Sequence, residues 1–162
     1  MSENGNNNRL RLGFLAAVEL KNRGYVGGLL TTNHHGRPLE FQCTTPVKPN
    51  PTQEILYGPT LKPWLLGELL GQTLVKRSQV KPKLIIVQRQ DMLELRNHIA
   101  IPVVRCLQSE EETASIPLIC HADFPDDRNA AAKILSSMTN ADLAEPIERV
   151  CEALNETLRA AA

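Results

Sequence analysis

The run Lys83-Leu84-Ile85-Ile86-Val87 places the strongest constraint on how this chain can fold. Consecutive apolar residues without alternation are typical of a strand that is covered on both faces, at the centre of a sheet with helices on either side. The 162 residues of the chain are enough for one domain with a sizeable core. We therefore expect an α/β fold in which Lys83–Val87 is the central strand.

Three earlier stretches predict an antiparallel meander. Apolar residues alternate over Leu10–Leu20, and Tyr25–Thr32 and Arg37–Val47 follow as a second and a third strand. The segment Asn33-His34-His35-Gly36 joins the last two and has the length and the final glycine of a common hairpin loop. Adjacent histidines point apart on an extended chain and lack the i, i+4 spacing of a helical metal site. We expect this pair to be a turn tip without a metal.

Helices are expected on both sides of the central strand. Asn50 is a good N-cap and Pro51 a good first residue for a short helix that ends at Tyr57. Thr60 can start a second helix, in which Gly67 and Gly71 share one face and are expected to let the helix approach the sheet closely. The remaining predicted elements are a helix over Asp91–His98, strands over Pro102–Leu107 and Ile116–Cys120, and helices over Asn129–Met138 and Leu143–Arg159. Ile116–Cys120 follows the preceding strand too closely for a crossover, so it is expected to be antiparallel or marginal.

Composition limits the classes of partner. Lys+Arg and Asp+Glu number 18 each and aromatic residues make up 4%, which argues against a broad nucleic-acid surface and against base-stacking platforms. No apolar stretch is long enough for a membrane span. The polar start of the chain predicts a disordered tail over residues 1–8 and a single α/β domain over 9–162. The four cysteines follow no secretory pattern, so we expect free thiols and a soluble cytoplasmic protein of bacterial type.

A meander followed by alternating helices and strands resembles the ribonuclease H-like superfold, which includes nucleases, Holliday-junction resolvases and endonuclease V-like repair enzymes. The resemblance covers about Leu10 to Leu107 and is one of topology. Longin-like and roadblock-like scaffolds also begin with antiparallel strands and remain alternatives. Because one superfold hosts many activities, the topology alone does not assign a function.

The resemblance implies that a nuclease of this type would bring acids together at the end of the first strand, the end of the fourth and a later element. In this sequence the candidates are Glu19, Asp91 and Asp123, and Mg²⁺ would be the cofactor. Gln88 and Gln90 stand where such an enzyme would use carboxylates, and an amide binds hard cations more weakly. Asp91 is equally explained as a helix N-cap.

A binding site is expected at the carboxyl ends of the parallel strands, where ligands sit in open α/β sheets. The residues there are Gln88, Arg89, Gln90 and Asp91, together with the stretch Leu107–Glu112. This edge combines polar groups but lacks an evident nucleophile or a paired acid and base. The sequence therefore favours a non-catalytic binding or scaffold domain without a cofactor, with a protein partner or a second copy as its ligand. The alternative is the metal-dependent nuclease.

Overall fold

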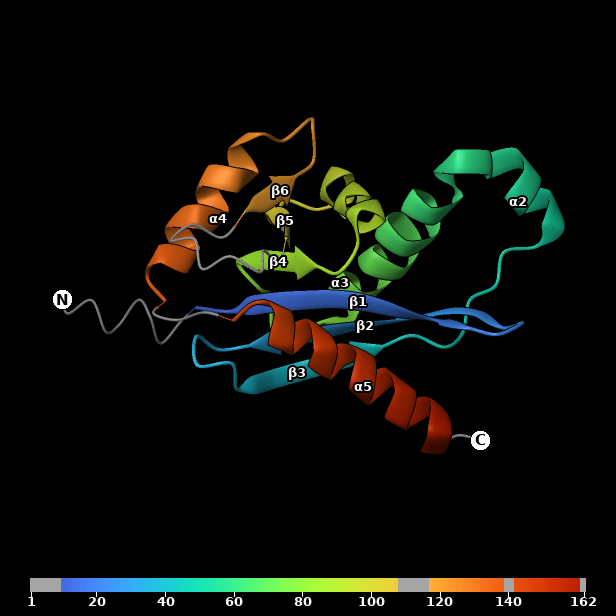
Figure 1. The fold of residues 1–162 in the computed structure, drawn as a ribbon, viewed down its shortest axis with the longest axis horizontal. Coiled ribbons are helices and arrows are strands. Elements are labelled where there is room, and N and C mark those ends of the chain that lie inside the picture. Colours follow the sequence, from blue (N-terminus) through green and yellow to red (C-terminus); the bar gives the residue numbers. More distant parts are fainter. Residues whose placement is uncertain (1–9, 108–116, 139–141, 161–162) are drawn as a thin grey trace.

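The computed structural model describes residues 10–107, 117–138 and 142–160, and the described strands form one mixed sheet in the order β3-β2-β1-β4-β5-β6 (Figure 1). The strands are β1 (Leu12–Leu20), β2 (Gly24–Thr32), β3 (Pro38–Cys43), β4 (Leu84–Val87), β5 (Val103–Cys106) and β6 (Leu118–Cys120). The helices are α2 (Pro51–Tyr57), η1 (Gly58–Thr60), η2 (Pro63–Gly71), α3 (Gln72–Arg77), η3 (Gln90–His98), α4 (Asp126–Ser136) and α5 (Ala144–Ala160).

The strand directions confirm the predicted fold class. The strands β1, β2 and β3 form an antiparallel meander, β4 runs parallel to β1 and β5, and β6 is antiparallel to β5. The sheet is thus a mixed one, compatible with a ribonuclease H-like α+β fold. All four residues of β4 are buried, as the continuous apolar run predicts for a central strand.

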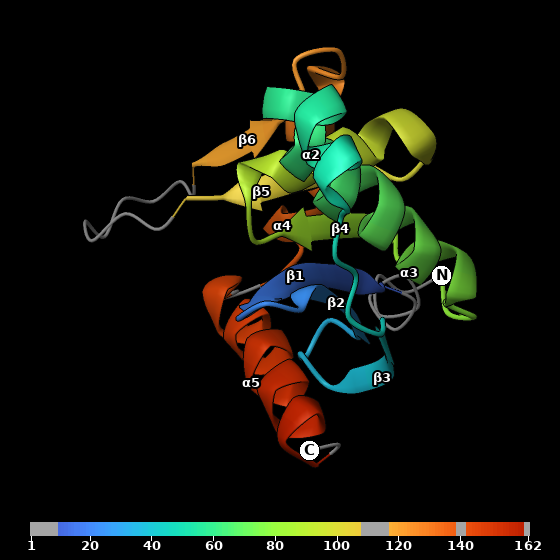
Figure 2. The same ribbon diagram turned by 90° about the vertical axis from the view of Figure 1, so that its right-hand side faces the viewer.

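The two faces of the sheet carry separate apolar cores because successive residues of a strand point to opposite sides. Phe14 and Ala16 of β1 pack in the core that α5 covers, whereas Leu15 and Ala17 pack in the core that η2, α3 and η3 cover. Figure 2 shows α5 and α3 on opposite sides of β1. The described strands are therefore covered by helices on both faces, and the carboxyl ends of the parallel strands β1, β4 and β5 lie at the same edge of the sheet.

The third strand is shorter than predicted, since regular pairing ends at Cys43. Thr44 still pairs with Gly27, and Val47 forms an isolated bridge with Tyr25. Pro46 between them has no N–H to offer a ladder, which accounts for the break. The helix expected from Thr60 is a π-helical segment, η2, followed by α3, and the 3₁₀ turn η1 joins it to α2. The helix before β5 is a 3₁₀ helix.

Gly67 and Gly71 allow close approach, but chiefly to η3 rather than to the sheet as expected. A Cβ on Gly67 would lie 2.9 Å from the Cβ of Glu94 and 3.0 Å from the carbonyl oxygen of Asp91. A Cβ on Gly71 would meet Leu95 of η3 at 3.1 Å, and Leu15 of β1 only at 3.4 Å. The glycine face of η2 therefore fixes its distance from η3.

Two sequence-based expectations fall outside the described residues: the disordered tail over residues 1–8, and the part of the Leu107–Glu112 stretch that follows Leu107. Within the described ranges, no helix is both long and apolar enough to cross a bilayer. The cysteines expected to be free, Cys43, Cys106, Cys120 and Cys151, are all free thiols.

Candidate functional site

Gln88, at the carboxyl end of β4, is held by its neighbours. Its Oε1 accepts a hydrogen bond from the Ala17 amide at 3.1 Å, and its Nε2 donates to Cys151 Sγ at 3.4 Å. The side chain thus links β4 to β1 and α5. It also lines a cavity of about 390 Å³ between the ends of β4 and β5 and the start of α5.

Arg89 and Asp91 lie on the other side of this edge, with Glu19 and Tyr25. The Arg89 guanidinium is 3.2 Å from Asp91 Oδ2, and both side chains are about one-third exposed. Glu19 faces Tyr25 across the β1–β2 ladder. Burial raises the pKa of Tyr25, the negative charge of Glu19 raises this pKa further, and the positive charge of Arg89 opposes it. Gln90 is exposed and begins η3.

Asp123 belongs to a different group of side chains. Its backbone amide donates to His121 Nδ1 at 3.0 Å, and His121 Nε2 lies 3.5 Å from Glu94 Oε2 and 3.2 Å from Asn97 Nδ2. The structure thus places Glu19 and Asp91 around Tyr25, and Asp123 beside His121. Within the described residues, no three His, Cys, Asp or Glu side chains gather closely enough to hold a metal ion.

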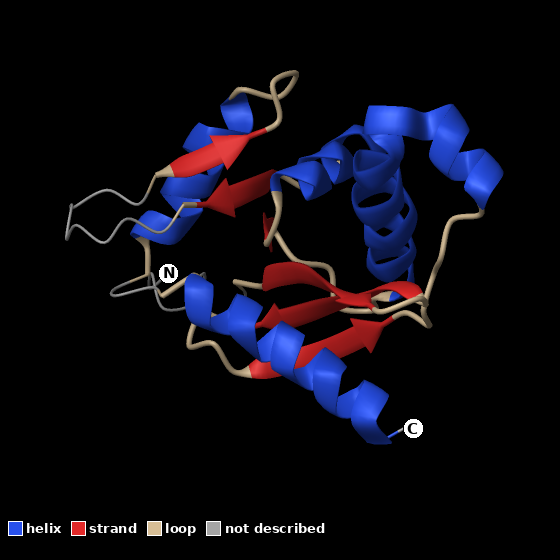
Figure 3. Ribbon diagram, turned by 45° about the vertical axis from the view of Figure 1, so that its right-hand side comes forward, coloured by secondary structure: helices blue, strands red, loops and turns tan. Residues whose placement is uncertain are grey.

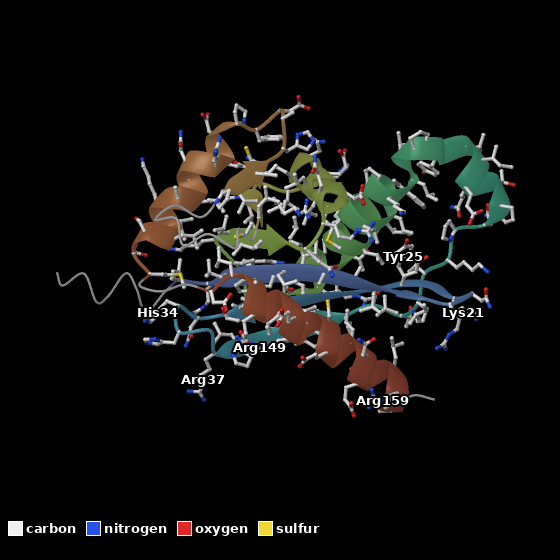
Figure 4. All side chains as sticks on the ribbon, in the orientation of Figure 1. Lys21, Tyr25, His34, Arg37, Arg149 and Arg159 are labelled. Atoms are coloured by element: carbon white, nitrogen blue, oxygen red, sulfur yellow. The ribbon has the colours of Figure 1, made fainter. Side chains whose placement is uncertain are left out.

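The His-His segment is a turn tip, as predicted. Asn33 Oδ1 accepts hydrogen bonds from the amides of His35 and Arg37 at 2.9 and 3.0 Å, and Gly36 has a φ of 81°. The Gly36 carbonyl accepts a hydrogen bond from Arg149 of α5 at 2.9 Å, so this tip is anchored to the helix. Figure 4 shows His34 and Tyr25 at opposite ends of β2.

A second surface, which sequence reasoning missed, is formed by α2. None of its residues is buried, and Ile55 and Leu56 are 79% and 78% exposed. The helix is nevertheless well formed, because Asn50 Oδ1 accepts from the Gln53 amide at 2.8 Å while Gln53 Oε1 accepts from the Asn50 amide at 3.0 Å. Figure 3 shows α2 at the end of a loop that leaves the sheet. The signal in the sequence was the apolar run Ile55-Leu56-Tyr57. Three consecutive residues of a helix point in different directions, so they cannot all be buried on one helix face.

A hollow of about 350 Å³ adjoins the end of α2. The rings of Tyr57 and Trp64 stack there, with centroids 4.2 Å apart and planes 14° from parallel. The lining residues are Tyr57, Pro59, Thr60, Pro63, Trp64, Glu68 and Glu94. The hollow therefore joins an aromatic wall to two carboxylates.

The sequence matches no family model and no curated protein. Among solved structures, the chain is similar to an Argonaute from Marinitoga piezophila, determined in complex with a 5′ OH guide RNA. The likeness has a TM-score of 0.35 and 11% sequence identity, and it covers 65% of this chain and 18% of the Argonaute chain.

Proposed function

We propose that this chain is a non-catalytic binding domain that holds a protein partner, and that α2 makes the contact. The observation that carries the proposal is the exposure of the consecutive residues Ile55 and Leu56 on a capped helix that buries nothing of its own. Most helices gain their stability from packing an apolar face, and α2 packs none of its own residues in the core. A partner that covers Ile55 and Leu56 would supply that packing, as in helix-in-groove recognition.

The surroundings of α2 support the same function. Tyr57 and Trp64 lie at its carboxyl end, and aromatic side chains are enriched at the centres of protein interfaces. Contiguous exposed apolar groups rimmed by polar ones mark interaction sites more often than scattered single residues do. Leu39 and Phe41 on β3 are also exposed, but only to 39% and 36%. The α2 surface is therefore the stronger candidate.

The alternative is a magnesium-dependent nuclease that uses Glu19, Asp91 and Asp123. Two-metal chemistry needs carboxylates that converge on ions about 3.5–4 Å apart. Glu19 and Asp91 share the surroundings of Tyr25, but the backbone and side chain of Asp123 are engaged with His121. The positions of these three carboxylates therefore give the nuclease hypothesis no better support than the topology did.

Selection from a random peptide library displayed on phage tests the binding function. The immobilised full chain is expected to enrich peptides whose affinity falls about tenfold or more in the double variant Ile55→Asp, Leu56→Asp. The matched control is Leu39→Asp, Phe41→Asp, which places the same charges on exposed apolar positions of β3. Peptides that bind the α2 variant as well as the wild type would contradict the proposal, and self-association lost in that variant would make a second copy the partner.

A further inference from the structure

The hollow beside α2 is negatively charged. Glu68 and Glu94 line it, and the lining contains no lysine or arginine. Glu94 Oε1 accepts a hydrogen bond from Asn97 Nδ2 at 2.9 Å. His121 Nε2 lies 3.5 Å from Glu94 Oε2, and His98 Nε2 lies 3.6 Å from Glu68 Oε2. An imidazole is a cation only when it is protonated. The hollow thus presents two carboxylates and no lysine or arginine among its lining residues.

The same hollow has an aromatic wall. The stacked rings of Tyr57 and Trp64 line it together with Pro59 and Pro63. The faces of Trp and Tyr rings attract cations, by about 0.5–2 kcal/mol depending on exposure. The proline rings add apolar surface against which the methylene stem of a long side chain can lie. The aromatic rings and the carboxylates are thus suited to the charged end of a lysine or an arginine, and the proline rings to its methylene stem.

We infer that the hollow receives a lysine or arginine side chain from the protein partner; the inference rests on the proposed binding function and names the partner's chemistry. The apolar residues beside that basic side chain cover Ile55 and Leu56, and its charged end lies between the Tyr57–Trp64 pair and Glu68 and Glu94. The volume of about 350 Å³ is near the lower end of ligand pockets, about 300–1,000 Å³, and suits one inserted side chain. A nucleic-acid strand does not fit the charge, since its phosphates would meet Glu68 and Glu94.

Trp64 allows a direct test because it is the only tryptophan in the chain. N-acetyl-arginine methylamide and its uncharged counterpart N-acetyl-norleucine methylamide are titrated into the full chain at pH 8 and low salt, with Trp64 fluorescence as the readout. The arginine compound is expected to bind saturably, with a Kd of roughly 10 mM or tighter. It is expected to bind about tenfold more weakly to Glu68→Gln, Glu94→Gln. Equal binding of the norleucine compound, or no saturable binding of the arginine compound, overturns the inference.

The control variant is Glu152→Gln, Glu156→Gln, which removes two exposed carboxylates from α5 and changes the net charge equally. It should bind the arginine compound like the wild type, and an equal loss of affinity in this variant would show that overall charge is responsible.

Phage selection separates the two proposals. Peptides that depend on Leu56 but carry no lysine or arginine at a fixed position overturn the inference and leave the binding function intact. Peptides that do not depend on Ile55 and Leu56 contradict the binding function, whatever the arginine titration gives.

Discussion

Arg96 donates from Nε to Asp127 Oδ2 at 2.8 Å while its guanidinium lies 3.9 Å from the centre of the Phe124 ring. The same carboxylate oxygen accepts from the Val103 amide at 3.3 Å, and Arg96 Nη1 donates to the Ile99 carbonyl at 2.8 Å. This cluster holds η3, β5 and α4 together. Asp127 is only 5% exposed, so its role is to stabilise the fold rather than to bind a ligand.

Removing this carboxylate should be costly. Asp127→Ala leaves the Arg96 guanidinium largely buried without its partner, and we expect a loss of about 3–5 kcal/mol in the free energy of unfolding. Urea denaturation measures it. The control is Asp91→Ala, which breaks the more exposed pair with Arg89 and should cost about 1 kcal/mol or less. Equal losses in the two variants would refute the structural role of Asp127.

The contact between η2 and η3 predicts an unusual effect of alanine. Alanine favours a helix over glycine by about 1 kcal/mol. In Gly67→Ala, however, the new methyl would lie 3.0 Å from the backbone oxygen of Asp91, and a backbone atom cannot move aside without the rest of η3. We therefore expect a net loss of about 1–3 kcal/mol in the free energy of unfolding. Gly71→Ala meets only the side-chain ends of Leu95 and Leu15 and should lose less. Chemical denaturation measures the free energy of unfolding of both variants. A Gly67→Ala variant more stable than Gly71→Ala would contradict this account.

Much of this fold could be predicted from local pattern. Alternation indicated the meander, the apolar run at Leu84–Val87 indicated the central strand, and Asn50 with Pro51 indicated the start of α2. These features depend on residues close together in the sequence. The closeness of η2 to η3 depends on how two helices pack in three dimensions, and periodicity alone could not distinguish a helix partner for Gly67 from a sheet partner.

The candidate site was harder to predict for a related reason. Apolar residues such as Ile55, Leu56 and Trp64 are normally assigned to a core, and only the folded structure shows that Ile55 and Leu56 remain exposed. The polar residues that were predicted, Gln88 to Asp91, do lie at the sheet edge. Gln88 is bonded to Ala17 and Cys151, which are remote in the sequence, whereas Arg89 pairs with Asp91 two residues away.

The exposure of α2 predicts that its apolar side chains do not stabilise the isolated chain. Ile55→Asp and Leu56→Asp should each change the free energy of unfolding by about 0.5 kcal/mol or less, as is usual for surface substitutions. Leu65 of η2 is 1% exposed, and Leu65→Ala should cost about 2–5 kcal/mol. Thermal or urea unfolding compares the three variants. A large loss in Leu56→Asp would mean that this side chain packs within its own chain.

Glu40 predicts a pH dependence in the acid range. Its carboxylate accepts hydrogen bonds from the amides of Val80 and Gln79 and from Gln42 Nε2, at 2.9, 3.2 and 3.1 Å. The bond from Val80 is the main reason that the pKa of Glu40 is below its ordinary value of 4.5. A lowered pKa contributes stability that is present above pH 4.5 and is lost as the pH falls through the folded-state pKa.

The variant Glu40→Gln isolates this contribution. We expect it to be less stable than the wild type by about 1 kcal/mol at pH 7, because a neutral amide accepts these bonds more weakly. The difference should shrink as the pH falls below 4.5, since the wild-type carboxylate is then protonated too. Urea midpoints of the two proteins measured from pH 7 to acid provide the comparison. A difference that is independent of pH would rule out the charged form as its source.

Tyr25 predicts the opposite behaviour in alkali. Burial and then the charge of Glu19 raise its pKa above 10.0, so the folded state keeps the neutral phenol. The resulting stability is present below pH 10.0 and is lost as the pH rises toward the folded-state pKa. The chain has two tyrosines, so Tyr57→Phe leaves Tyr25 as the only one to follow by phenolate absorbance. In this background Glu19→Gln should lower the midpoint of the Tyr25 titration toward 10.0. It should not reach 10.0, because burial is the largest cause of the raised pKa and remains. Arg89→Ala should raise the midpoint, because the positive charge of Arg89 lowers the pKa. Circular dichroism at each pH confirms that the chain is still folded. A midpoint that Glu19→Gln leaves unchanged would show that Glu19 does not raise the pKa of Tyr25.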